Sequence, residues 1–76
     1  MKIKNEHIVE AFTRLDERMQ GTDNRPLIFL SVKEVFEMGQ FYEWAKPLAK
    51  NDDTDPEAST EVPEDLVWVM LKILKM

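Results

Sequence analysis

Cysteine is absent from this chain of 76 residues, and histidine and glycine are scarce, with one and two copies. Without cysteine there is neither a disulfide nor a thiolate ligand for a metal ion. The glycines, Gly21 and Gly39, do not form the glycine-rich loop that cradles phosphates. A catalytic site would require a nucleophile placed beside a base, and the sequence shows no nucleophile at a recognisable spacing from the single histidine, His7. We therefore expect a protein that is not an enzyme and that holds no metal or cofactor.

Long apolar runs are also missing. The longest, Leu66–Leu71, has six residues, whereas a membrane-spanning helix needs about 20. The first ten residues contain no apolar stretch of the length that a secretory leader needs. We expect neither a membrane segment nor export, and the lack of cysteine is consistent with the reducing cytoplasm.

Charge is unevenly distributed. Residues 1–50 contain eight basic and eight acidic residues, whereas residues 51–65 contain seven acidic residues and no basic one, and the net charge is -5. The polar segment 51–62, called the acidic connector below, therefore makes the protein acidic. Because no basic patch is present to neutralise phosphates, the composition argues against direct binding of nucleic acid.

The apolar spacing predicts three helices. In the segment 5–20, apolar residues recur at steps of four, three and four, with Asn5 as the expected N-cap. A second helix from Val32 follows a capping box of Ser31 and Glu34, with a possible kink at Gly39 and a break at Pro47. A third helix opens at Pro63, has acids in its first turn and lysines in its last, and so matches the helix dipole.

These elements predict an all-α fold, a small three- or four-helix domain that spans residues 1–76 without an internal boundary. Periodicity alone does not separate a short buried strand from a buried helix segment. The alternative is therefore an α+β fold with a short strand at 27–30 or 66–70. Such a small domain has a thin core, so we expect support from a second subunit.

Two partial motifs point to other functions. Asp53, Asp55, Glu57 and Glu64 fall at the calcium-ligand positions of an EF-hand loop. However, the position that requires glycine is Ala58, and two prolines restrict the backbone, so a solvated acidic loop is the better interpretation. Residues 30–39 resemble the first helix of a helix-turn-helix, but residues 40–44 are aromatic and acidic, unlike a recognition helix.

The most informative segment is 66–76, in which nine of eleven residues are apolar. A helix that is apolar nearly all round must be covered on more than one side, and a small monomer leaves one side for a partner. We expect the protein to be a homodimer. We also expect it to act as an accessory or regulatory protein that binds another protein. An alternative is a phage- or plasmid-type inhibitor of a host nucleic-acid enzyme, and another is a helix-turn-helix-like DNA-binding accessory protein. The residues expected to contact a partner are Trp68, Met70, Leu71, Leu74, Asp52, Asp53, Asp55 and Glu57.

Overall fold

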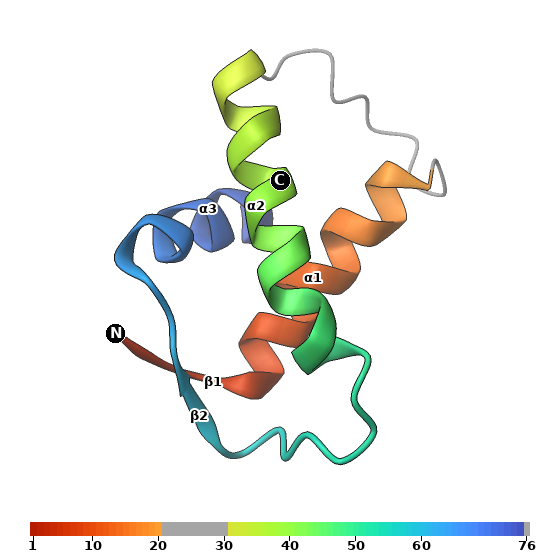
Figure 1. Ribbon diagram of the computed structural model, residues 1–76, viewed down its shortest axis with the longest axis vertical. Coiled ribbons are helices and arrows are strands. Elements are labelled where there is room, and N and C mark those ends of the chain that lie inside the picture. The colour runs from red at the N-terminus through yellow and green to blue at the C-terminus, as the bar shows by residue number, and fades with distance from the viewer. Residues whose placement is uncertain (21–30, 76) are drawn as a thin grey trace.

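In the part of the chain that the structure describes, three helices pack around one core, and a short two-stranded sheet lies beside them (Figure 1). The computed structural model describes residues 1–20 and 31–75. In chain order the elements are β1 (Lys2–Lys4), α1 (Asn5–Met19), α2 (Val32–Ala49), β2 (Ser59–Glu61) and α3 (Glu64–Leu74). The predicted small helical domain is confirmed.

The strands are not where the sequence suggested. β1 and β2 pair antiparallel, with Ile3 opposite Thr60. The alternative strand at 66–70 is wrong, because these residues lie in α3, where helical spacing lets the apolar side chains share one buried side. The other suggested strand, at 27–30, lies outside the described residues.

Three of the four residues in the predicted apolar stripe of the first helix are buried, and the last, Met19, is 54% exposed. The N-terminus of this helix also differs from the prediction. Lys4 is the N-cap residue and makes no side-chain cap, while Asn5 is the first helical residue and is buried. The backbone amides of Asn5 and Glu6 donate instead to the carbonyls of Ala58 (2.8 Å) and Pro56 (3.2 Å). The prediction of Asn5 as N-cap is therefore wrong, because the acidic connector supplies the acceptors that a capping side chain would provide.

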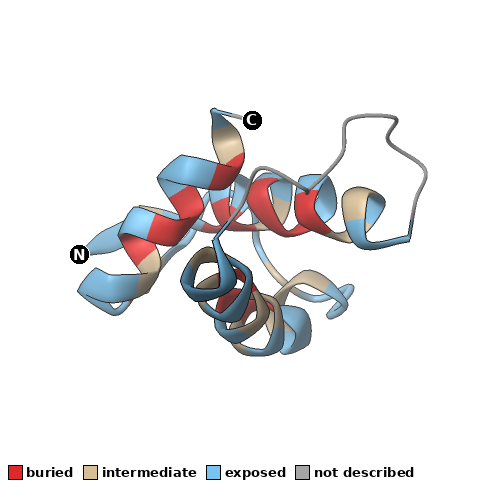
Figure 2. Ribbon diagram, turned by 90° about the horizontal axis from the view of Figure 1, so that it is seen from above, coloured by how far each residue is buried: buried red, intermediate tan, exposed pale blue. Residues whose placement is uncertain are grey.

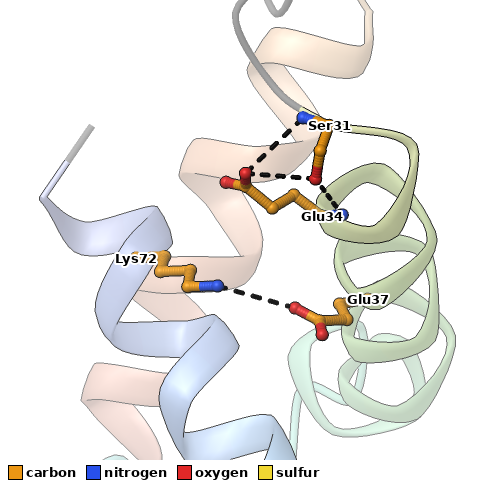
Figure 3. A network of polar contacts seen from close by, with 4 residues as sticks. All are labelled: Ser31, Glu34, Glu37 and Lys72. Carbon is orange, nitrogen blue, oxygen red and sulfur yellow. Dashed lines mark hydrogen bonds and ion pairs between the residues drawn. The ribbon is translucent and has the colours of Figure 1, made fainter.

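The second helix begins at the predicted capping box. The Ser31 hydroxyl accepts a hydrogen bond from the Glu34 amide at 3.1 Å, and the Ser31 amide donates to the Glu34 carboxylate at 3.5 Å (Figure 3). The predicted break at Pro47 is wrong, since α2 continues to Ala49. Proline removes only one backbone hydrogen bond there, close to the helix end, and the last residues, Leu48 and Ala49, pack against the core.

The core is formed by the sides of the helices that face one another (Figure 2). Phe12 of α1 stacks on Tyr42 of α2 with ring centroids 4.7 Å apart, and the Tyr42 hydroxyl donates to Asp16 at 2.8 Å. In the described part of the chain, every buried side-chain nitrogen or oxygen has a hydrogen-bond partner. The fully buried large side chains are Ile8, Leu15, Phe41, Val62 and Ile73.

The third helix is tied to both of the others. Its Lys72 ammonium lies 3.7 Å from the Glu37 carboxylate of α2 (Figure 3). The Arg14 guanidinium of α1 donates to the Leu74 carbonyl at 2.7 Å, which satisfies one of the free carbonyls at the end of α3. Neither α3 nor any other helix within residues 1–20 and 31–75 is both long enough and apolar enough to cross a membrane.

Candidate protein-binding surface

The outward side of α3 carries an exposed tryptophan. Trp68 is 62% exposed and Leu71 is 39% exposed, although most apolar residues of this helix are covered. Glu64, Trp68, Leu71 and Lys75 follow one another at steps of four, three and four residues, so they lie along one side of the helix. We call this set the Trp68 face. It combines an acid at one end, two apolar residues in the middle and a base at the other end.

A mainly apolar hollow of about 330 Å³ adjoins the Trp68 face. Its lining consists of Met1, Glu64, Val67, Trp68 and Leu71. This volume is at the lower end of the roughly 300 to 1,000 Å³ found for small-molecule sites. The hollow is therefore suited to one large apolar side chain rather than to an extended cofactor.

Hydrogen bonds hold Met1 beside this hollow. Its carbonyl accepts from the Val62 amide at 2.9 Å, and its ammonium donates to the Glu61 carboxylate at 2.7 Å. This hydrogen bond, with the positive charge of the ammonium, holds the pKa of Glu61 below its ordinary value. Met1, which forms one wall of the hollow, is thus held in place by residues at the ends of the two-stranded sheet.

On its other side, Trp68 borders a smaller hollow of about 210 Å³ with a more polar lining. This hollow includes the Glu37 and Lys72 ion pair between α2 and α3, together with Gln40 and Asp65. Trp68 is therefore a ridge with an apolar hollow on one side and a charged hollow on the other. An aromatic ridge with polar groups around it has the composition of the central part of a protein interface.

The four apolar residues that the sequence suggested as partner contacts do not share one environment. Trp68 and Leu71 are exposed, Leu74 is half-buried, and Met70 is only 4% exposed. Met70 belongs to the inward strip of α3, where it packs with Ile73 in the core. The structure therefore narrows the apolar part of the predicted surface to Trp68 and Leu71.

The acidic residues suggested as contacts, Asp52, Asp53, Asp55 and Glu57, are all exposed. Some of them also serve local structure, because the Asp55 carboxylate accepts from the Glu57 amide at 2.9 Å, and the Lys4 ammonium lies 3.6 Å from Glu57. Their turn lies at the far end of β2 from α3 (Figure 1). The two surfaces predicted from the sequence therefore do not form one continuous site.

His7 Nε2 lies 3.8 Å from the Glu6 carboxylate on the exposed start of α1. No cluster of three or more His, Asp or Glu side chains that could hold a metal ion is found within the described ranges. The acidic connector instead uses Asn51 and Asp55 to accept backbone amides in tight turns.

The sequence did not reveal a second exposed apolar patch, at the start of α2. Val32, Val35 and Phe36 are 88%, 51% and 66% exposed. Phe36 is thus about as exposed as Trp68, but it borders neither of the hollows beside Trp68. This difference makes Phe36 a suitable control for experiments on Trp68.

Comparisons of the chain with protein families, with curated proteins and with solved structures give no significant match.

Proposed function

We propose that this chain is a non-catalytic binding protein that docks on another protein chain through the Trp68 face. The observation that carries the proposal is an exposed tryptophan beside an apolar hollow, on a helix whose inward side is already packed. Tryptophan is enriched among the residues that contribute most to protein interfaces, especially where it fills or borders a pocket.

The energetic argument concerns the exposed indole. A tryptophan side chain buries about 150 to 250 Å² when it is fully covered, and each Å² contributes about 25 cal/mol. With Trp68 62% exposed, a partner that covers the rest would gain about 2 to 4 kcal/mol before the costs of association. Coverage of Leu71 and filling of the hollow would add to this gain.

The other functions suggested by the sequence have less support. A helix-turn-helix would need a turn near Gly39, but α2 runs continuously from Val32 to Ala49. Inhibition of a nucleic-acid enzyme and a location in the cytoplasm stay predictions, since both were drawn from composition alone.

A binding experiment with matched variants tests the proposal. Proteins retained from an extract of the source cells are compared for the wild type, Trp68→Ser and Phe36→Ser, and a protein lost only with Trp68→Ser is identified and purified. We expect its dissociation constant to rise at least about tenfold for Trp68→Ser, from the loss of a central aromatic contact. Phe36→Ser should bind like the wild type.

Circular dichroism and thermal melting of both variants provide the folding control, since loss of binding counts only in a folded protein. Equal loss of binding for the two variants would indicate nonspecific adhesion of apolar surface. Retention of every bound protein by folded Trp68→Ser would overturn the proposal.

A further inference from the structure

We infer that the partner seated on the Trp68 face is a second copy of this chain, with the two α3 helices antiparallel. The inference rests on the proposed function, because it names an occupant for the same face. In this arrangement a two-fold axis passes between Trp68 and Leu71. Each Trp68 then faces Leu71 of the second copy.

The spacing of the face suits such a pair. Steps of four, three and four residues produce the narrow seam along which two helices pack side chain into gap. In the antiparallel register with its axis between Trp68 and Leu71, Glu64 of each copy faces Lys75 of the other. One register therefore matches all four residues of the face, and by symmetry each contact occurs twice.

The charges select the antiparallel direction. Glu64 lies in the first turn of α3 and Lys75 at its C-cap. Within residues 1–20 and 31–75, neither side chain takes part in an ion pair or a side-chain hydrogen bond. An antiparallel pair brings these opposite charges together, whereas a parallel pair would set Glu64 against Glu64 and Lys75 against Lys75.

The apolar part of the face is complementary to itself as well. The hollow bordered by Trp68, Leu71 and Met1 has about 330 Å³, and in the antiparallel register the apolar side chains of the second copy point towards it. Because the pair has two-fold symmetry, the side chains of each copy fill the hollow of the other in the same way. This gives each copy an apolar centre flanked by opposite charges, the usual arrangement of a self-complementary interface.

The exposed patch of α2 borders neither of the hollows beside Trp68. The residues that continue the Phe36 side of α2 at helical steps are Gly39, Glu43 and Lys46. An antiparallel pair centred on this side would bring Phe36 close to the Glu43 carboxylate of the second copy. The Trp68 face is therefore the better seam for a second copy.

The size of the face sets the strength of the pair. α3 has 11 residues, which makes it about 16 Å long at ~1.5 Å per residue. Stable dimers usually bury about 800 Å² on each partner, and one side of so short a helix supplies less than that. We therefore expect weak self-association that depends on protein concentration. Sedimentation at concentrations up to the high micromolar range measures it.

Charge reversal distinguishes this register from any other. Glu64→Lys sets like charges opposite each other twice, as does Lys75→Glu. Each variant should weaken self-association about tenfold, because it both removes two attractive contacts and introduces two repulsive ones. An equimolar mixture of the two variants restores opposite charges at both contacts. We expect the association constant of the mixture, measured by sedimentation, to lie within about threefold of the wild-type value.

Glu6→Lys is the matched control, because it makes the same charge change in the first turn of α1, away from the proposed seam. It should leave self-association unchanged. Trp68→Ser should abolish self-association, and circular dichroism should show that every variant is folded.

The outcomes separate this inference from the proposed function. A wild type that stays monomeric to high micromolar concentration, while a different protein still binds in a Trp68-dependent way, would overturn the second copy and leave the proposed function standing. A dimer that both charge reversals leave intact, or that their mixture does not strengthen, would overturn the register. Absence of self-association together with absence of any Trp68-dependent binding would overturn both.

Discussion

The inner and outer sides of the helices contain similar residues in very different surroundings. Phe12 and Phe41 are buried in the core, whereas Phe36 and Trp68 are among the most exposed large residues of the described chain. All four are aromatic residues in amphipathic segments. The comparison shows that the spacing of apolar residues predicts a helix, whereas the packing of the whole fold decides which of these residues are buried.

The difference is sharpest within α3. Val69 is 3% exposed and its neighbour Trp68 is 62% exposed. A rotation of about 100° around the helix axis separates the two side chains, so one points into the core while its neighbour points outward. The inner side contributes stability and the outer side is available for binding, and this division can be tested with single substitutions.

The largest effect is expected on the inner side. Phe12→Ala removes a ring that is 3% exposed and stacks on Tyr42, and it should lower the free energy of unfolding by about 3 to 5 kcal/mol. In a domain this small, such a loss should unfold much of the protein at 25 °C. Urea unfolding followed by circular dichroism measures the change.

The matched control is Met19→Ala, since Met19 lies on the same helix and is 54% exposed. Its effect should stay within about 0.5 kcal/mol. Equal destabilisation by the two substitutions would contradict the division into inner and outer sides.

A buried polar residue provides the second test. The Asn5 amide donates to the Asp55 carbonyl at 2.9 Å and accepts from the Thr60 hydroxyl. Asn5→Ala leaves the part-buried Thr60 hydroxyl without this acceptor, and it leaves the Asp55 carbonyl with only the Ala58 amide, at 3.2 Å, as a donor. We expect a cost of about 1 to 3 kcal/mol. Thermal melting measures this loss.

Thr60→Val removes one member of the same network. In a double-mutant cycle with Asn5→Ala, the double mutant should lose less free energy of unfolding than the sum of the losses in the two single mutants. Strict additivity would show that the two side chains act independently.

The outer side should tolerate substitution. Trp68→Ser should change the free energy of unfolding by less than about 1 kcal/mol, since most of the indole is already in water. Val69→Ser, one residue away, places a hydroxyl in the core and should cost several times more. A greater loss of stability from Trp68→Ser than from Val69→Ser would show that Trp68 belongs to the core.

The smallest effect concerns Tyr42, at the boundary of the core. Its hydrogen bond to Asp16, with the nearby negative charge, raises the pKa of the phenol above its ordinary value of 10.0. This contribution to stability is fully present below pH 10 and is lost as the pH rises through the folded-state pKa. Tyr42→Phe should therefore remove part of the alkaline fall in stability, measured by melting between neutral and strongly alkaline pH. An unchanged alkaline profile would contradict the assignment to this hydrogen bond.

The sequence predicted the helices well because their signals are local. The Ser31 capping box and the dipole charges of α3 depend on residues within one or two turns, and the structure confirms both elements. The helical spacing of α1 likewise needs no knowledge of the rest of the chain. These features follow from the chain's own geometry.

The features that could not be predicted depend on distant partners. β1 has three residues with one apolar side chain, too few for any periodic signal, and its partner strand lies about three-quarters of the chain away in sequence. Asn5 looked like an N-cap, although its bonding partners come from the acidic connector. The interior position of Met70 and the outward position of Trp68 both depend on how α1 and α2 meet α3, which the pattern of α3 alone does not contain.

The capping of α1 by the acidic connector has a consequence for the nascent chain during synthesis. Asn5 and Glu6 leave the ribosome well before Ala58 and Pro56, whose carbonyls accept from their amides. Contacts this distant in sequence form slowly compared with local helix formation. A nascent chain that has not reached residue 56 therefore holds an α1 with an uncapped first turn.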